Sequence, residues 1–185
     1  MTLVSAPAGY GKTVLVASWL DTLDLPHVWL TLDARHCEPA RFAAELTAAL
    51  RPLLPAGTDT QPPHRLAPPA LADHLLAALD ALPNPTVVVL DGYHALERSE
   101  AQALVSRLIP RLPRHLRLML LTRRDPPLAL AGLRAHGLLT EVRTNALRFT
   151  AAETTALLAQ LPGAPTDDAT VARLLEATEG WITGM

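Results

Sequence analysis

The sequence predicts an α/β fold in which helices alternate with the strands of a largely parallel sheet and lie on both of its faces. Three observations lead to this prediction. Short, β-rich apolar segments are separated by stretches with helical periodicity. A glycine-containing loop at residues 6–13 joins the first of these strands to the first helix. Four consecutive aliphatic residues at 87–90 end in Asp91, and such continuous apolar runs are typical of strands buried on both faces of a parallel sheet.

The loop matches the phosphate-binding (Walker A) pattern G-x-x-x-x-G-K-[ST], with alanine in the place of the first glycine. In this pattern the backbone N–H groups and the positive end of the next helix face the anion. We expect Lys12 to reach the phosphates and the Thr13 hydroxyl to hold Mg²⁺. The full expected nucleotide-binding set is Ala8, Gly9, Tyr10, Gly11, Lys12, Thr13 and Val14. The alternative is a glycine-containing turn before an ordinary amphipathic helix.

Composition supports the phosphate-binding interpretation and limits the other functions. Lys12 is the only lysine among 16 basic residues, and a compact ammonium suits a phosphate better than a guanidinium does. The net charge of −2 argues against nucleic-acid binding by this segment. Cys37 is the only cysteine, which excludes an internal disulfide and fits a reducing compartment. No apolar run reaches the roughly 20 residues of a membrane helix and no signal peptide is visible, so we expect a cytoplasmic protein without membrane contacts.

The strands follow from apolar, β-rich composition. After a short first strand that contains Leu3 and Val4, we expect strands at residues 28–32, 86–91, 116–121 and 139–143. Prolines and a glycine at residues 55–69 predict a surface loop. Both ends of the chain look cut, because the first strand has barely begun at Met1 and no closing element follows the last helix.

The helices follow from apolar periodicity and from their end signals. We expect helices at residues 14–23, 38–50, 70–82, 97–109, 128–136, 150–161 and 167–179. Pro39 lies in a first turn, Gly137 follows a helix end, and residues 150–153 form a capping box. The last two helices come after the fifth strand, so we expect them to form a small helical lid.

Two polar side chains are predicted to meet the loop at the ligand-binding edge of the sheet. Asp91 ends a buried strand, where open α/β sheets bind ligands, and we expect it to hold Mg²⁺ directly or through water. Arg123 ends the next strand and is expected to sense the γ-phosphate. The alternatives are a helix N-cap role for Asp91 and a surface ion pair between Arg123 and Asp125.

With these motifs in place, the sequence resembles the nucleotide-binding domain of the MalT/LuxR-type ATP-dependent transcriptional regulators, which belong to the STAND class of signalling P-loop ATPases. The resemblance covers essentially the whole chain and rests on SAPAGYGKT, VWLTLD, EPARF, VVVLDGYHAL, LLTRRDPPLALAGLRAHG, LRFTAAE and LLEATEGW. It implies a three-layer α/β/α P-loop NTPase fold with a five-stranded parallel sheet in the order 5-1-4-3-2, followed by a small helical segment. The P-loop core would span residues 1–148 with a truncated first strand, and residues 149–185 would begin an incomplete lid.

The resemblance also implies a function. Such proteins are switches that are closed with ADP and able to oligomerise with ATP and an inducer. In the full-length protein, the inducer, self-association and DNA would be bound through domains absent here. Asp91 would be the Walker B acid and Arg123 the sensor, both counted as catalytic, while Tyr93 and His94 match a Tyr-His pair of the family.

Two departures from the family pattern bear on catalysis. Gly92 stands where the family commonly has a second acid, and losing a general base costs roughly 10²–10⁴-fold in rate. Ile182 stands where many relatives have proline in a region that touches the nucleotide. We therefore expect a switch that binds ATP and ADP with Mg²⁺ and is at most a slow Mg-dependent ATPase. The alternatives are a truncated, non-catalytic interaction module and an active ATPase or kinase.

Overall fold

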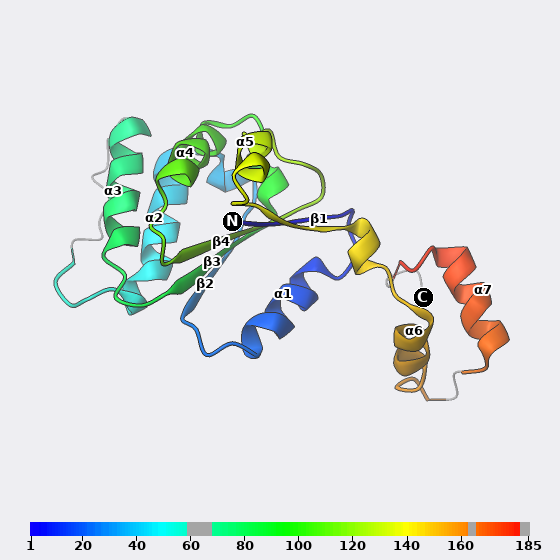
Figure 1. The fold of residues 1–185 in the computed structure, drawn as a ribbon. Helices are drawn as coiled ribbons and strands as arrows, with labels where there is room; N and C mark the ends of the chain where they lie inside the picture. The colour runs from blue at the N-terminus through cyan, green and yellow to red at the C-terminus, as the bar shows by residue number, and fades with distance from the viewer. Residues whose placement is uncertain (59–67, 163–165, 182–185) are drawn as a thin grey trace.

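The computed structural model describes residues 1–58, 68–162 and 166–181. Its centre is a single sheet of five parallel strands in the order β2-β3-β4-β1-β5, which is the expected order 5-1-4-3-2 viewed from the other edge (Figure 1). The strands are β1 (Thr2–Ser5), β2 (His27–Thr31), β3 (Thr86–Asp91), β4 (Leu116–Thr122) and β5 (Thr140–Arg143). The prediction of a parallel α/β sheet is confirmed.

The expected helices are present, with ends that differ by a few residues from the predicted ones. They are α1 (Lys12–Asp21), α2 (Pro39–Leu50), α3 (Pro68–Asp80), α4 (Glu100–Leu108), α5 (Leu130–Ala135), α6 (Ala151–Leu158) and α7 (Asp168–Thr178). The prediction of a loop at 55–69 is wrong at its end, because α3 begins at Pro68. Proline is tolerated in a first helical turn, where its missing N–H has no partner to lose. Residues 59–67 of that predicted loop lie outside the described residues.

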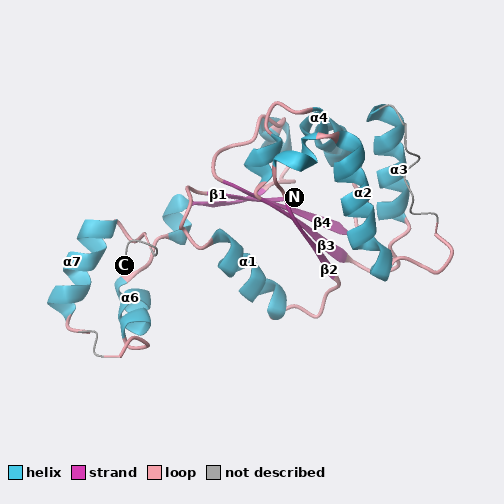
Figure 2. Cartoon of the chain, turned by 180° about the vertical axis from the view of Figure 1, so that it is seen from behind, coloured by secondary structure: helices cyan, strands magenta, loops and turns pink. Residues whose placement is uncertain are grey.

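The two faces of the sheet are covered unequally. Helices α2, α3, α4 and α5 lie on one face, and α1 lies on the other (Figures 1 and 2). The handedness of parallel crossovers explains this division. The connections from β2 to β3, β3 to β4 and β4 to β5 all run in one direction across the sheet, so their helices share a face. The connection from β1 to β2 runs in the opposite direction, which places α1 on the opposite face.

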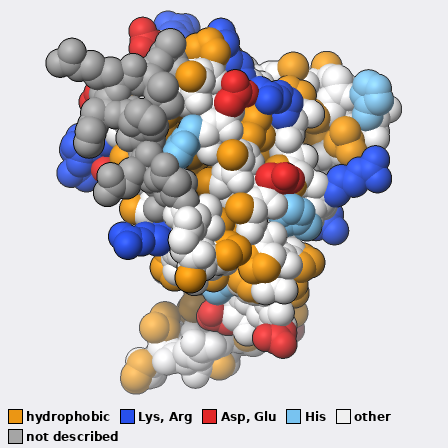
Figure 3. Space-filling model, turned by 90° about the vertical axis from the view of Figure 1, so that its left-hand side faces the viewer, with side chains coloured by type: hydrophobic (Ala, Val, Ile, Leu, Met, Phe, Trp, Pro, Cys, Tyr) orange, Lys and Arg blue, Asp and Glu red, His pale blue; other side chains and the backbone are white. Residues whose placement is uncertain are grey.

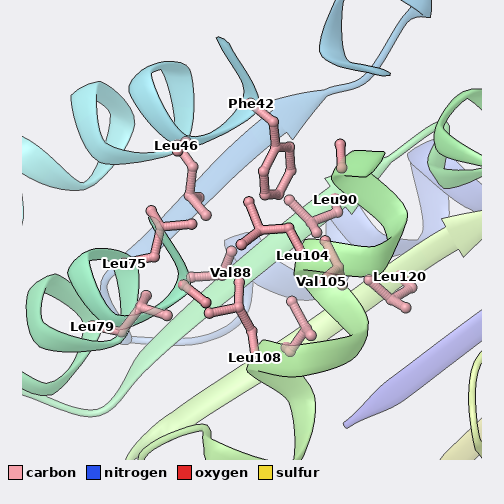
Figure 4. Packing of buried hydrophobic residues seen from close by; sticks show 14 of the residues in the cluster. Phe42, Leu46, Leu75, Leu79, Val88, Leu90, Leu104, Val105, Leu108 and Leu120 are labelled. Atoms are coloured by element: carbon pink, nitrogen blue, oxygen red, sulfur yellow. The ribbon is translucent and has the colours of Figure 1, made fainter. Parts of the chain in front are cut away.

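Alternating strand residues divide the apolar core between these two faces. The larger cluster fills the space between the sheet and α2, α3 and α4, where Phe42, Leu75 and Leu104 pack over Val88 and Leu90 (Figure 4). The smaller cluster lies under α1 and combines Val16 and Leu20 of that helix with the strand residues Val4, Val87, Val89, Met119 and Leu121. Strand β3 contributes buried side chains to both clusters, as the unbroken aliphatic run predicts.

The register of the sheet brings the carboxyl ends of its strands together. Ser5 at the end of β1 pairs with Thr122 at the end of β4, and Asp91 at the end of β3 pairs with Thr31 at the end of β2. The loop that follows β1 therefore begins beside the residues that follow β3 and β4. Among the described residues, no helix is both long and apolar enough to cross a membrane.

Helices α6 and α7 pack against each other and stand apart from the sheet (Figure 1). The expected capping box begins α6: the Thr150 hydroxyl accepts a hydrogen bond from the Glu153 N–H at 3.3 Å, and the Glu153 carboxylate accepts one from the Thr150 N–H at 2.8 Å. These reciprocal bonds satisfy two backbone donors that a helix start otherwise leaves without partners.

Candidate functional site

The glycine-containing loop forms the tight connection that its sequence predicts. It runs from the end of β1 to the start of α1, and both Gly9 and Gly11 have positive φ angles, of 80° and 69°. This conformation is disfavoured for residues with a Cβ, so the two glycines allow the loop to turn directly into the helix. Gly11 is the N-cap of α1 and gives no side-chain cap. The first N–H groups of α1 therefore remain oriented as an anion site would need them.

Lys12 folds back over the loop. Its Nζ donates to the carbonyl oxygens of Ala6 at 2.8 Å and Pro7 at 2.7 Å. An ammonium has three N–H donors, so these two bonds leave one for a ligand. Burial lowers the pKa of Lys12, the nearby Asp91 charge opposes this shift, and Arg123 adds to it. The loop carbonyls thus hold the only lysine of the chain at the edge where Asp91 and Arg123 end their strands.

Thr13 and Asp91, the two expected magnesium ligands, are brought into direct contact. The Thr13 hydroxyl donates to Asp91 Oδ2 at 2.9 Å, across 78 positions of sequence. A hydroxyl and a carboxylate are oxygen donors of the kind that Mg²⁺ prefers. Among the described residues no group of three or more His, Cys, Asp or Glu side chains is placed to hold a metal ion. The arrangement fits Mg²⁺, which is usually held by one or two protein oxygens together with phosphates, and not a metal caged by protein ligands alone.

A pocket of about 350 Å³ lies at the carboxyl edge of the sheet. Arg123 lies in its wall together with Lys12, Thr13 and Asp91. The alternative ion pair between Arg123 and Asp125 does not form, because Asp125 instead accepts hydrogen bonds from the Ser5 hydroxyl and from the Arg143 guanidinium. Among the described residues Arg123 forms no ion pair with a carboxylate, and it lines the pocket.

The Tyr-His pair after β3 is divided between the core and the pocket. Tyr93 is fully buried, and its hydroxyl has no partner among the described residues. His94 lines the 350 Å³ pocket, and its Nδ1 is buried and likewise without a described partner. Burial and then the nearby Arg123 charge hold the pKa of His94 below its ordinary value, against the opposing charge of Glu97. At neutral pH the pocket therefore presents a neutral imidazole beside its cationic residues.

Gly92 leaves no room for a second acid in this backbone. Its φ is 76°, and a Cβ built on it would lie 2.9 Å from the backbone oxygen of Leu32. The backbone N–H of Leu32 also donates a hydrogen bond to the backbone carbonyl oxygen of Asp91 at 2.7 Å, which joins the ends of β2 and β3. Among the described residues that line this pocket, Asp91 is the only carboxylate.

A second pocket, of about 580 Å³, is lined by residues 9–15 of the loop and α1 and by residues 146–149 and Glu153. The two pockets share Gly9, Lys12 and Thr13. The wall on α1 includes Val14 and Leu15, and the opposite wall is formed by Ala146, Leu147, Arg148, Phe149 and Glu153. Sequence reasoning missed this opposite wall. Its residues lie in a short 3-10 turn after β5, in the connection that follows, and at the start of α6. The stretch LRFTAAE at 147–153 contributes to the family resemblance, but nothing in its residues indicates that it lies opposite the loop.

The end of α7 returns to the phosphate loop. Gly180 O accepts a hydrogen bond from the Phe149 N–H at 3.0 Å, and Glu179 forms an ion pair with Arg148 at 3.0 Å. The indole Nε1 of Trp181 then donates to the carbonyl oxygen of Ala8 at 3.2 Å. Trp181, the last described residue, is thus in contact with the phosphate loop.

Comparisons with known proteins agree with the sequence motifs. No family model matches the chain. The regulator "HTH-type transcriptional regulator MalT" of Serratia proteamaculans is 34% identical over 198 residues, which cover all of this chain and 21% of that protein. MalT of Yersinia enterocolitica is 32% identical over 192 residues, again covering 100% of this chain and 21% of the relative. The chain therefore spans about one fifth of the length of these curated relatives.

Among solved structures, the Aeropyrum pernix ORC1 protein, in complex with DNA, aligns with a TM-score of 0.52 and 20% identity over 96% of this chain and 48% of that one. Drosophila ORC bound to DNA aligns with a TM-score of 0.50 and 15% identity over 77% of this chain and 79% of that one. At these identities the similarity concerns the fold alone. The chain is therefore similar, over its whole length, to one part of these MalT transcriptional regulators, and its five-stranded parallel sheet with flanking helices has a P-loop NTPase-like α/β fold.

Proposed function

We propose that this chain is an ATP- and ADP-binding switch domain of a bacterial, LuxR-family, MalT-like transcriptional regulator, with weak or no ATP hydrolysis of its own. One observation carries the proposal: Lys12, Thr13, Asp91 and Arg123 converge on one pocket at the end of a glycine-containing loop. Loop amides, an ammonium, a metal-binding pair and a free guanidinium are the groups that phosphate-binding sites of this fold use. Homology to the MalT regulators supports the biological context.

In this proposal, residues 8–14 hold the phosphates through backbone N–H groups and Lys12 Nζ. Thr13 and Asp91 hold Mg²⁺, which would neutralise phosphate charge when bound. Arg123 approaches the γ-phosphate from the end of β4, so its interaction distinguishes ATP from ADP. The nucleoside occupies the 580 Å³ pocket, whose apolar α1 wall suits a base.

Weak hydrolysis follows from the carboxylates available. Asp91 is the only described carboxylate in the phosphate pocket, and a metal ion would occupy it. Gly92 supplies no side chain to orient an attacking water. A site that lacks its general base still binds its ligand, because binding uses the loop, Lys12 and Mg²⁺. The chain would be at most a slow Mg-dependent ATPase.

We propose a P-loop core at residues 1–148 and a helical lid at residues 149–185. DNA, an inducer and self-association would involve other parts of the longer regulator, and this segment would not bind nucleic acid directly. Its net charge is −2, and on the face seen from the α3 side, acidic, basic and hydrophobic side chains are interspersed (Figure 3). Nucleic-acid-binding domains usually present a basic stripe instead.

Isothermal titration calorimetry with Mg·ATP and with ADP tests the proposal. Replacing Lys12 by alanine removes a charge-assisted hydrogen bond, which is worth about 1.5–3 kcal/mol, so affinity should fall roughly 10- to 150-fold. The control is Arg111→Ala, which breaks an exposed ion pair with Asp73 far from the loop and should leave affinity unchanged. Equal binding by the wild type and Lys12→Ala would contradict the proposed site.

Two further measurements separate the alternatives. Steady-state turnover well above ~1 s⁻¹, or phosphate transferred to an acceptor, would indicate an active ATPase or kinase. A melting temperature that does not respond to saturating ATP or ADP would indicate a non-catalytic interaction module, because a ligand bound only by the native state must raise stability.

A further inference from the structure

The turn that follows β4 has Arg123 at its centre. The hydroxyl of Thr122, a fully buried residue, donates to the carbonyl oxygen of Arg124 at 2.8 Å and so closes the turn around Arg123. The Thr122 carbonyl oxygen accepts a hydrogen bond from the Ala6 N–H at 3.3 Å, which joins this turn to the start of the phosphate loop. The backbone on the N-terminal side of Arg123 is therefore held beside the loop.

An ion pair holds the residue that follows Arg123. Arg124 donates from Nε to Glu97 Oε2 at 2.8 Å and pairs with the same carboxylate from Nη2 at 2.6 Å. Glu97 follows the short 3-10 turn Tyr93–Leu96, and only 13% of its side chain is exposed. This two-pronged contact fixes direction as well as distance, so it ties Arg124 to the chain after β3.

A second ion pair holds the next residue, Asp125. Its carboxylate accepts a hydrogen bond from the Ser5 hydroxyl at 3.1 Å and pairs through both oxygens with the Arg143 guanidinium. Ser5 ends β1 and Arg143 ends β5, so one carboxylate connects the turn after β4 to the next two strands of the sheet. Hydrogen bonding from Arg143 lowers the pKa of Asp125, which keeps the carboxylate ionised at neutral pH.

These pairs leave one of the three arginines for a ligand. Glu97 and Asp125 neutralise Arg124 and Arg143, whereas Arg123 forms no ion pair with a described carboxylate and lines the 350 Å³ pocket. An arginine side chain has many rotamers to lose when it binds, so a backbone that is already fixed lowers the cost of ordering it. The network thus prepares Arg123, and not its neighbours, to meet an anion.

We propose that Asp125 is a positioning residue for Arg123: it clamps the turn after β4 to β1 and β5 and thereby holds the Arg123 guanidinium where the third phosphate of a nucleoside triphosphate would lie. The inference rests on the proposed function, in which Arg123 distinguishes ATP from ADP. Both oxygens of Asp125 already accept hydrogen bonds from Ser5 and Arg143. Its effect on ATP should therefore pass through Arg123 and leave ADP almost unchanged.

Calorimetric titration of the whole chain with Mg·ATP and with Mg·ADP tests this role in Asp125→Asn, Arg123→Ala and the double variant. Asparagine keeps the size of the side chain and an acceptor for Ser5, but it loses the charge that holds Arg143. Exposed ion pairs have modest effects, so Asp125→Asn should bind ATP about two- to fivefold more weakly and ADP as the wild type does. Arg123→Ala removes a charge-assisted contact and should bind ATP roughly 10- to 150-fold more weakly.

The double variant shows whether the two residues act together. If Asp125 acts through Arg123, the double variant should lose no more ATP affinity than Arg123→Ala alone. Arg143→Ala breaks the same pair from β5 and should reproduce the selective loss of ATP affinity. The matched control is Asp73→Asn, because Asp73 is similarly exposed, at 62% against 50% for Asp125, and pairs with Arg111 on the far helices. It should leave both affinities unchanged.

Several outcomes would overturn the positioning role and leave the nucleotide site intact. They are unchanged ATP affinity in Asp125→Asn, an equal loss for ATP and ADP, and a double variant whose loss is the product of the two single losses. Failure of the wild type to bind either nucleotide would overturn the proposed function itself. Arg123→Ala that binds ATP as tightly as the wild type would refute the sensor, and the role of Asp125 with it.

Discussion

The turn after Asp91 offers a sharp test of how the site is built. Replacing Gly92 by alanine adds one methyl group at a residue with a φ of 76°. Two costs arise: the left-handed conformation costs a residue with a Cβ about 1–2 kcal/mol, and the new Cβ meets the Leu32 oxygen at 2.9 Å. Relieving such overpacking by a backbone shift costs about 1–3 kcal/mol more. We expect Gly92→Ala to lower the free energy of unfolding by about 2–5 kcal/mol in total.

A matched glycine separates the two costs. Gly137 follows α5 with a φ of 66°, and a Cβ there would meet no atom within 4 Å. Gly137→Ala should therefore cost only the conformational part, about 1–2 kcal/mol. Urea unfolding of both variants measures the difference, and thermal unfolding should show a further decrease of about 2–4 °C for each additional kcal/mol in a chain of this size.

The difference between the two variants is the informative quantity. If Gly92→Ala and Gly137→Ala lose equal stability, the close approach of β2 to the Asp91 turn has no energetic consequence and the reasoning is refuted. If Gly92→Ala loses more stability than Gly137→Ala, the close approach of Leu32 to Gly92 contributes to stability. Leu32 also joins the ends of β2 and β3, since its N–H donates to the backbone oxygen of Asp91.

Three further changes test other parts of the structure. Tyr93→Phe removes a buried hydroxyl without a described partner, so stability should stay unchanged or rise by up to about 1 kcal/mol in urea unfolding; a loss would indicate a hydrogen bond at that oxygen. Hydrogen bonds from Arg134 and Arg143 lower the pKa of Glu141 from 4.5 to about 2. The stabilisation of the folded state by the ionised Glu141 is therefore fully present above pH 4.5 and is lost as the pH falls towards 2. Glu141→Gln should therefore lower the melting temperature at pH 7 and make it decline less between pH 4.5 and about pH 2 than in the wild type. Parallel curves of melting temperature against pH for the two proteins would contradict this. Thr150→Ala removes the α6 cap and should cost about 1 kcal/mol, measured by urea unfolding, whereas no change would show that Glu153 holds the helix start alone.

The strands and their chain order could be predicted because each is a short apolar run that ends in a turn signal. Thr86–Asp91 is the clearest example, since its unbroken aliphatic run indicates burial on both faces and its last residue is an acid. The order in which the strands lie side by side is implied only by the family resemblance, because local periodicity contains no information about which strands are neighbours.

The core of the site could be predicted for a similar reason. Lys12 and Thr13 belong to one contiguous motif, and Asp91 and Arg123 end strands whose carboxyl ends meet in any parallel sheet of this kind. The contact between Thr13 and Asp91 follows from that meeting. Sequence reasoning also expected helices on both faces of the sheet, but it gave no sign that α1 would lie alone on its face.

The remaining parts of the site depend on tertiary packing. Phe149 and Glu153 line the larger pocket because the connection after β5 bends towards the start of α1. Trp181 reaches Ala8 because Gly180 lets the chain pass against Phe149. Phe149 and Glu153 lie in LRFTAAE and Trp181 lies in LLEATEGW, two of the stretches on which the family resemblance rests. The residues alone do not show that these stretches contact the loop, so the contacts become visible only when the chain is folded.

The solitary lysine gives this chain an unusual spectroscopic simplicity. Isotopically labelled lysine would produce a single set of side-chain resonances, and those resonances would come from an ammonium held by two carbonyls of the phosphate loop. An acylating reagent selective for amines would find only this ε-amine and the α-amine of Met1, which lies at the opposite edge of the sheet against the Leu138 oxygen. Occupancy of the loop can therefore be followed at one atom, without mutation and without an attached dye.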